Sequence, residues 1–433
     1  MHYTKQKIEM AAIENVDVVI VGAGIAGLAT AVALKRVGVR ALVLERAKEL
    51  RTTGAALTLF PNAWLALDAL GVSHKLTSVY KPILKIFATD IRTGAVQELA
   101  LTAKNKNDLG PRTVHRSALL EALAEELPVD AIRFSCKITG IETQSKQNSS
   151  IASIIHMEDG TTIETKILVG CDGVHSMVAH WLGLREIANS GRSAVRGIAV
   201  YPEGHGLKQE VQQCLDEGKR GGFVPLNEKE LYWFVAFQSP HNGEIMVGKP
   251  ELIHSEVLEN YAKNFPPMFI DVVRHSDLSR LSIAPLVFRY PWDIIFGDLS
   301  KGNVTVAGDA MHPMTPDLGQ GGGSALEDAV LLGRYIGKAF IEHQKLDSKD
   351  INQAIQGYVN ERRWRVAALV AGSYVSGWAQ QGGAGWLKKF IRDSIFYKFL
   401  LYGIAKLQLY DCGRLPTVSS NADGVEQNSS KMD

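Results

Sequence analysis

The chain has 433 residues, which is too long for a single hydrophobic core, so we expect two or three domains. Hydrophobic residues make up 46% and charged residues 21% of the chain, as is ordinary for a globular protein. The formal net charge of +1 gives no electrostatic case for a nucleic-acid partner. The cysteines are scattered without a C-x-x-C pair, which argues against a zinc site or a disulfide framework and suits a reducing compartment. They are Cys136, Cys171, Cys214 and Cys412.

The first predicted unit is a strand that leads through glycines into a helix. The strand covers residues 16–21, the turn reads Gly22-x-Gly24-x-x-Gly27, and the helix runs to residue 36. In a dinucleotide site the first glycine makes the turn, the second lets pyrophosphate approach, and the third lets the helix pack on the strand. The pattern therefore predicts a site for one end of a dinucleotide, and a glycine turn without a ligand is the alternative.

A second strand supports this interpretation. It covers residues 41–44 and ends at Glu45, about 20 residues after the turn. That carboxylate is placed to accept hydrogen bonds from a ribose, and it would repel a 2′-phosphate. No second G-x-G-x-x-G unit occurs in the sequence, so we expect one dinucleotide at such a site.

Helices and β-rich runs then alternate up to residue 192. We predict a polar loop over 51–56, helices over 62–70 and 117–127, a hairpin over 83–101, and a meander with strands over 132–141, 151–157 and 161–169. The meander leads to Asp172-Gly173, so a carboxylate and a glycine precede a helix a second time.

The sequence pattern changes over residues 194–284, where short β-branched or aromatic runs are bounded by glycine, proline and asparagine. This pattern predicts a separate, largely antiparallel sheet, with a helix over 251–265.

A second ligand cradle is predicted between residues 302 and 329. It contains an apolar strand over 304–307 and then, in order, Gly308, Asp309, His312, Pro313, Pro316, Gly319, Gln320 and Gly321. A helix is expected from about residue 324. Glycines let the backbone approach a ligand closely, and the free N–H groups of a helix start attract electron-rich oxygen or negative charge.

The C-terminal part is predicted to be helical. The helical pattern begins at residue 351, and residues 386–402 combine an apolar face with several lysines and arginines. We interpret this stretch as a helix that packs on the rest of the chain, and a peripheral helix at a membrane surface is the alternative. The polar tail over residues 416–433 is expected to be disordered.

These elements predict an α/β fold. We expect a Rossmann-like domain whose parallel sheet carries a β-meander, a mostly antiparallel β-sheet domain for the substrate, and C-terminal helices. The expected boundaries are 1–14 for an N-terminal extension, 15–82 with 108–192 and 285–350 for the discontinuous Rossmann-like domain, 83–107 with 193–284 for the β-sheet domain, 351–415 for the helices and 416–433 for the tail.

Three motifs in this order resemble the aromatic-ring hydroxylase class of FAD-dependent monooxygenases, which has the para-hydroxybenzoate hydroxylase fold. The motifs are Gly22-x-Gly24-x-x-Gly27 with Glu45-Arg46, Cys171-Asp172-Gly173-x-x-Ser176, and Gly308-Asp309-Ala310-x-His312-Pro313-x-x-Pro316. The chain around them is similar to the plant branch of salicylate-hydroxylase-like and zeaxanthin-epoxidase-like enzymes. One departure is Ala179, which stands where the family usually has an arginine linked to pyridine nucleotide or pyrophosphate.

The resemblance implies FAD as cofactor and NAD(P)H as co-substrate. It places the ADP half of FAD on Gly22, Ala23, Gly24, Ala26, Gly27, Glu45 and Arg46. It places Asp309 on the ribityl chain, Arg116 against FAD, Asp172 and Gly173 near FAD and NAD(P)H, and Pro316, Gly319, Gln320 and Gly321 beside the flavin ring.

The resemblance also implies that one atom of O2 is transferred, through a flavin C4a-(hydro)peroxide, to a small and mostly apolar metabolite. The substrate is expected to be aromatic, alkaloid or isoprenoid, and the reaction a hydroxylation or an epoxidation. The candidates for lining its pocket are Arg196, Tyr232, Trp233, Phe234 and Phe288. Because strand residues alternate faces and the register is open, each is as much a core or surface candidate.

His312 and Pro316 are candidates for a catalytic role at the flavin edge, with a structural role as the alternative for His312. No metal site is expected, since the histidines and cysteines are scattered.

Other functions remain open at this point. They are a flavin-dependent reductase of isoprenoid double bonds, an NAD-dependent dehydrogenase built on the first motif, and a non-catalytic flavin-binding regulator. No transit peptide is recognised before residue 16, so the expected compartment is the cytoplasm, with a plastid as the alternative. The sequence leaves open the oligomeric state and the choice between NADH and NADPH.

Overall fold

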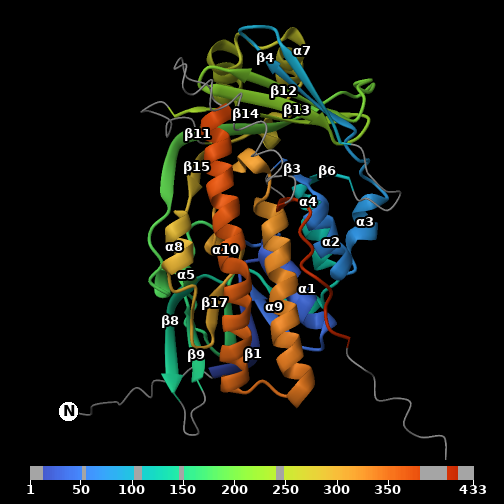
Figure 1. The fold of residues 1–433 in the computed structure, drawn as a ribbon. Helices are drawn as coiled ribbons and strands as arrows, with labels where there is room; N and C mark the ends of the chain where they lie inside the picture. Colours follow the sequence, from blue (N-terminus) through green and yellow to red (C-terminus); the bar gives the residue numbers. More distant parts are fainter. Residues whose placement is uncertain are drawn as a thin grey trace, which may run out of the picture.

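The computed structural model describes residues 13–50, 55–101, 110–145, 151–239, 248–380 and 407–417. One β-sheet lies toward each end of the molecule (Figure 1). Two long helices, α9 (Gly321–His343) and α10 (Ser348–Gln380), run side by side along the first sheet, and α10 extends up to the second sheet.

The first sheet has a parallel core. Its strands in the described part of the chain are β1 (Ile13–Val21), β2 (Ala41–Leu44), β7 (Ile132–Arg133), β8 (Ile138–Ser145), β9 (Ile151–Met157), β10 (Thr162–Gly170), β16 (Ser300–Lys301) and β17 (Val304–Val306). The order is β16-β17-β10-β1-β2-β7, and β1 pairs in parallel with both β10 and β2. Antiparallel β8 and β9 extend this sheet from β10 as the predicted meander.

Two boundaries in this sheet differ from the sequence prediction. β1 begins at Ile13, three residues early, because Ile13 pairs with Thr162 at the start of the long strand β10. The run predicted as one strand over residues 132–141 is two strands, since β7 pairs with β2 and only β8 joins the meander.

The helix α1 (Ile25–Arg36) is buried at every residue from Ala26 to Leu34, which accounts for its apolar sequence there, and Lys35 and Arg36 at its end are exposed. It packs between the parallel sheet and α9, and two glycines of α9 permit the close approach. An added Cβ would lie 2.7 Å from the Cβ of Ala33 at Gly333, and 2.7 Å from the Cβ of Val37 at Gly337.

The second sheet is mostly antiparallel. Its strands, in spatial order, are β15 (Ser282–Phe288), β11 (Ala188–Val200), β14 (Glu230–Gln238), β13 (Lys219–Pro225), β12 (Glu210–Asp216), β4 (Lys85–Asp90) and β5 (Val96–Ala100). The predicted hairpin is present as β4 and β5, and β4 joins this sheet by pairing in parallel with β12. An apolar core that includes Phe265 and Phe269 packs on one face, with α6 (Pro250–Glu256), the π-helical turn Val257–Tyr261 and α7 (Pro267–Arg274).

The remaining elements connect these layers. They are β3 (Ala56–Leu59) paired with β6 (Arg112–His115), the helices α2 (Pro61–Ala69), α3 (Ser73–Thr77), α4 (Arg116–Ala124), α5 (Met177–Trp181) and α8 (Pro291–Phe296), and the 3-10 turns Val129–Ala131, Leu278–Arg280, Gly308–Ala310 and Pro316–Leu318. The predicted α/β class, with a parallel sheet, an antiparallel sheet and C-terminal helices, is confirmed.

In the ranges described, no helix combines the length and the apolarity needed to cross a membrane. The helix predicted over residues 386–402, the tail from residue 418 and most of the loop 51–56 lie outside the described residues.

Candidate active site

The first glycine turn is tightly packed at its ends and open in its middle. An added Cβ at Gly22 (φ +101°) would lie 2.6 Å from the carbonyl oxygen of Cys171, and at Gly27 it would lie 1.9 Å from that of Gly22. At Gly24 no atom lies within 4 Å of this position. The helix α1 begins at the next residue, so its free N–H groups lie beside the open position. This geometry fits a pyrophosphate group.

Glu45 braces this turn from β2. Its Oε2 accepts the N–H of Ala23 at 2.8 Å, its Oε1 accepts the N–H of Ala47 at 2.8 Å, and its side chain is buried. Arg46 is exposed beside it. The contacts predicted for Glu45 with a ribose and for Arg46 with adenosine remain predictions.

Three turns follow three neighbouring parallel strands, so they lie at one edge of the sheet. They come after β1, β10 and β17. At Gly308 (φ +61°), an added Cβ would lie 2.8 Å from the Cβ of Ala26 in the first turn of α1. The two cradles predicted from separate parts of the sequence therefore pack directly on each other.

Asp309 is the exposed carboxylate of the second cradle. Its side chain is exposed, yet the protein around it desolvates the carboxylate, and this raises its pKa. His312, Arg116 and Arg196 act in the opposite direction by favouring the charged form. Asp309 therefore lies within electrostatic range of Arg116 at the start of α4 and of Arg196 on β11.

The predicted flavin turn is the N-terminus of α9. Pro316 opens the 3-10 turn Pro316–Leu318 and is exposed, and Gly319 follows with φ +63°. α9 then starts at Gly321, about three residues earlier than predicted, so the glycine run forms the first helical turn. The positive end of a 23-residue helix thus lies beside Pro316, where it can stabilise negative charge on a ligand. Gln320 is buried, and its side-chain Oε1 accepts a hydrogen bond from Nδ2 of Asn62.

His312 does not lie at an open edge. Its ring is fully buried, and Nε2 lies 2.7 Å from Oδ2 of Asp328 on α9. Burial alone would raise the pKa of Asp328, but His312 and Arg362 outweigh it and hold that pKa below its usual value. We therefore withdraw His312 as a catalytic candidate and assign it to the support of the turn.

The carboxylate of the Asp172-Gly173 motif caps a helix. Asp172 accepts the Ser176 hydroxyl at 2.5 Å and the N–H of Met177 at 2.7 Å, at the start of α5. Burial raises the pKa of Asp172, and these donors partly offset the shift. Ala179, which stands in place of the family arginine, is buried in the core. The spacing D-G-x-x-S therefore has a local structural reason, and contacts of Asp172 and Gly173 with FAD or NAD(P)H remain predictions.

Three substrate candidates share one face of the second sheet. Arg196 of β11 is paired in register with Phe234 of β14, and the rings of Phe234 and Tyr232 have centroids 6.2 Å apart. Burial raises the pKa of Tyr232, and the cation of Arg196 lowers it, so these two side chains are also close. Since Arg196 is in range of Asp309, this face lies toward the second cradle.

Trp233 is on the opposite face of β14, as the alternation of a strand requires. It is fully buried, its Nε1 donates to the Ser276 hydroxyl at 2.9 Å, and its ring packs edge-on against Phe269. The suggestion that Trp233 lines the pocket is therefore corrected, because this side chain fills the core. Phe288 is buried against Tyr290 and Tyr374, with ring centroids 5.1 and 4.9 Å away, so its contacts tie it to α8 and α10.

A buried ion cluster at the flavin turn was not predicted from the sequence. Asp317 accepts two hydrogen bonds from Arg192 of β11, at 2.7 and 3.1 Å, and Nη1 of Arg220 on β13 lies 3.6 Å away. An added Cβ at Gly377 of α10 would lie 2.3 Å from Asp317 Oδ2. The signal in the sequence was Arg192, which precedes Arg196 by four residues and so has the same strand parity.

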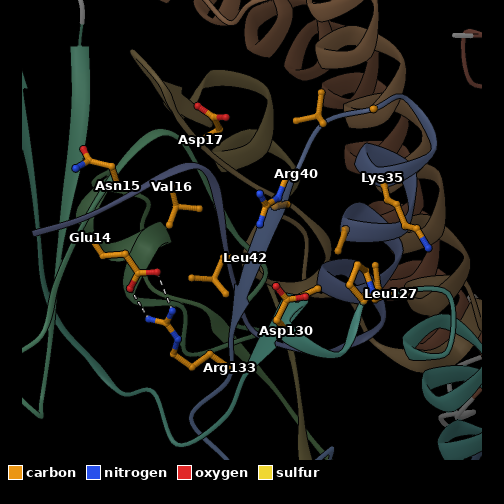
Figure 2. A pocket seen from close by; sticks show the side chains of 16 residues that line it. Glu14, Asn15, Val16, Asp17, Lys35, Arg40, Leu42, Leu127, Asp130 and Arg133 are labelled. Atoms are coloured by element: carbon orange, nitrogen blue, oxygen red, sulfur yellow. Dashed lines mark hydrogen bonds and ion pairs between the residues drawn. The ribbon is translucent and has the colours of Figure 1, made fainter. Parts of the chain in front are cut away.

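A cavity of about 480 Å³ lies at the other edge of the parallel sheet. Its lining includes the first residues of β1 and β2, whereas the turns described above follow the carboxyl ends of the strands. Figure 2 shows Glu14 joined to Arg133 by two hydrogen bonds, with Asp17, Arg40 and Asp130 around them. We assign this cavity neither cofactor nor substrate. Within the described ranges, no group of three or more His, Cys, Asp or Glu residues is arranged to hold a metal ion.

Comparison with known proteins identifies the ligand. A family model described as an FAD binding domain matches residues 15–373. Monooxygenase 2 of Arabidopsis thaliana is 40% identical over 92% of this chain and 98% of its own length. An FAD-dependent urate hydroxylase of Mycolicibacterium vanbaalenii is 28% identical over 82% of this chain and 86% of its own. The fold matches that of Klebsiella pneumoniae HpxO solved with FAD and uric acid, with a TM-score of 0.77, 24% identity, and coverage of 92% and 98%.

The matched region contains both glycine turns, Asp309 and the face of Arg196. The resemblance drawn from the three motifs is confirmed, and the alternative of an NAD-dependent dehydrogenase is excluded by the family. The chain belongs to the FAD-binding family of flavoprotein monooxygenases.

Proposed function

We propose that the protein uses NAD(P)H and O2 to hydroxylate a small planar, electron-rich substrate that lies between the face of Arg196, Tyr232 and Phe234 and the flavin ring. The observation that supports this proposal is the direct packing of the two turns at Gly308 and Ala26, with Arg196 in electrostatic range of Asp309. This arrangement supports one FAD molecule that spans both turns and presents its ring to the second sheet.

The residues present fit FAD. The open position at Gly24, beside the start of α1, suits the pyrophosphate, and the solvent-exposed Asp309 suits the hydroxyls of the ribityl chain. The start of α9 over Gly319, Gln320 and Gly321 offers N–H groups to the ring. Bound FAD would supply the redox chemistry that makes O2 electrophilic, and these residues would orient the ring and stabilise the charge it acquires on reduction.

Arg196 favours hydroxylation of an ionisable ring over epoxidation of an isoprenoid. It is partly buried and donates no hydrogen bond to the part of the chain that the structure describes. A guanidinium in this state can bind a substrate oxygen and favour its anionic form, which makes an aromatic ring more nucleophilic. Relatives named for urate and for a 4(1H)-quinolone also favour a ring substrate, since both compounds contain planar heteroaromatic rings.

A substrate panel tests the proposal. We expect phenolic and heteroaromatic compounds to accelerate NADH or NADPH oxidation, with one atom of ¹⁸O₂ found in the product. Arg196→Met should raise KM for the best substrate by at least about tenfold, the loss of one charged hydrogen bond, and Arg196→Lys by less. Anaerobic product formation, or labelling from water, would show that this function is wrong. The cytoplasmic compartment and the membrane-surface alternative for residues 386–402 stay predictions.

A further inference from the structure

We propose that Arg362 is a positioning residue for FAD, which fixes both turns of the cofactor site from α10 and so couples cofactor binding to the packing of that helix. This inference depends on FAD occupying the two turns. It does not depend on the substrate or on turnover, so it can fail or stand independently of the proposed reaction.

Arg362 is fully buried, and all three of its side-chain nitrogens donate hydrogen bonds to α9. Its Nε donates to Asp328 Oδ1 at 2.6 Å, its Nη1 to Glu327 Oε2 at 2.5 Å, and its Nη2 to the Ser324 hydroxyl at 2.7 Å. A planar guanidinium held at all three nitrogens has one orientation, and it sets the orientation of its acceptors in return.

One branch of this network ends at the turn of Asp309. The second oxygen of Asp328, Oδ2, accepts the backbone N–H of Gly308 at 2.7 Å and lies 2.7 Å from Nε2 of His312. Gly308 and His312 bracket Asp309 in the chain. Through one carboxylate, Arg362 therefore holds both sides of the turn that presents the Asp309 side chain.

The other branch ends at the flavin turn. Glu327 Oε1 accepts Nδ2 of Asn62 at 2.6 Å, and the same Nδ2 donates to Gln320 Oε1 at 2.9 Å. Gln320 is the residue that precedes Gly321, where α9 begins. The orientation of this helix start therefore depends on Arg362 together with Arg365, which donates two further hydrogen bonds to Glu327.

The charges around Glu327 and Asp328 explain why Arg362 matters more than its neighbours for the position of the two turns. Glu327 and Asp328 are adjacent and fully buried, and the cations bound to them are Arg362, shared by both, and Arg365, which binds Glu327. Without Arg362, Asp328 would keep His312 and the N–H of Gly308 as partners, and a buried carboxylate that loses its arginine relaxes toward water or takes up a proton. Either response weakens the hydrogen bond that the N–H of Gly308 donates to Asp328.

Coupling of this kind is reciprocal. If the packing of α10 improves the affinity for FAD, bound FAD must strengthen the packing of α10 by the same factor, although we expect no contact between Arg362 and the cofactor. A residue that supports only the fold would lower stability equally with and without FAD.

Arg362→Gln and Arg363→Gln make a matched pair, since the neighbouring Arg363 donates to the Ile295 carbonyl of α8 and has no bond to this network. In titrations of the deflavinated protein followed by flavin fluorescence, Arg362→Gln should raise the Kd for FAD at least tenfold and shift the visible spectrum of residual bound flavin. Arg363→Gln should stay within twofold of the parent protein, and Arg362→Lys should fall between. A folded Arg362→Gln protein with unchanged Kd and spectrum overturns the proposal.

Hydrogen exchange on the unaltered protein tests the same coupling if Arg362→Gln fails to fold. Added FAD should slow amide exchange in α10 around residues 358–366, and leave α7 over Pro267–Arg274 unchanged as the control helix. Equal exchange of α10 with and without FAD would refute the coupling.

Discussion

At Gly24 and Gly27, three residues apart in one turn, a methyl group would meet very different surroundings. At Gly27 it would collide with the carbonyl oxygen of Gly22, and at Gly24 it would enter open space. The backbone at Gly24 has φ −81°, which any residue adopts. The two glycines are therefore required for different reasons, one by the fold and one by the ligand.

Gly24→Ala should separate these reasons. We expect the free energy of unfolding of the FAD-free protein to change by less than about 1 kcal/mol, because the new methyl group touches nothing. The Kd for FAD should rise at least about tenfold, because the methyl group occupies the space for pyrophosphate. Denaturant unfolding and flavin titration measure the two quantities. Gly27→Ala is the contrasting control, with about 1–3 kcal/mol lost from overpacking, and equal effects of both variants on unfolding would contradict this explanation.

At the level of single elements, the two faces of β14 have different roles. Trp233 fills the core against α7, while Tyr232 and Phe234 lie on the face of Arg196. The aromatic run was visible in the sequence, but the assignment of faces was not, because a shift of one residue in register exchanges them. The register comes from pairing with β11, more than 30 residues away along the chain.

Truncation of Trp233 should mainly lower the stability of the fold, whereas truncation of Phe234 should mainly raise KM. Trp233→Ala should lower the free energy of unfolding by about 3–5 kcal/mol, as expected for a fully buried large aromatic, and leave KM within about twofold in protein that remains folded. Phe234→Ala should raise KM severalfold with a smaller loss of stability, since Phe234 is only partly buried. Steady-state kinetics and thermal unfolding decide, and a raised KM in Trp233→Ala alone would reverse our assignment of faces.

The start of α9 also differs from what the local sequence predicts. The helix is expected from about residue 324, after three consecutive glycines, yet Gly321–Gly323 form its first turn. Their neighbours give the reason, because an added Cβ at Gly322 would lie 2.6 Å from Leu57, and at Gly323 3.1 Å from Asn62. Close packing against β3 and α2 selects glycine here, and local propensity could not reveal it.

On the scale of the whole molecule, the pair of Arg192 and Asp317 ties the second sheet to the flavin turn. The two side chains are 125 residues apart, both are buried, and α10 closes over them at Gly377. The three cofactor motifs, the order of the elements and the fold class could be predicted, because each depends on local pattern. The Arg192 pair and the Arg362 network could not, since each depends on which distant segments meet.

Gly377→Ala should reproduce the loss of this ion pair without altering a charge. The added methyl group would lie within 2.5 Å of both partners, so the pair must separate. We expect Gly377→Ala and Arg192→Met each to cost about 3–5 kcal/mol of unfolding free energy, the effect of breaking a buried pair. The double variant should cost much less than the sum of the two. Additive losses in denaturant unfolding would mean that Gly377 acts on something else.

The contact between Gly308 and Ala26 has a consequence for the choice of cofactor. Because the two turns touch, the span between them is fixed, and a ligand that reaches both gains affinity by effective concentration: once one end is bound, the other end is held near its own turn. FMN would leave the turn at Gly24 empty, and ADP would leave the turn at Asp309 empty. Each forfeits this gain, so the protein selects its flavin by length as well as by chemistry.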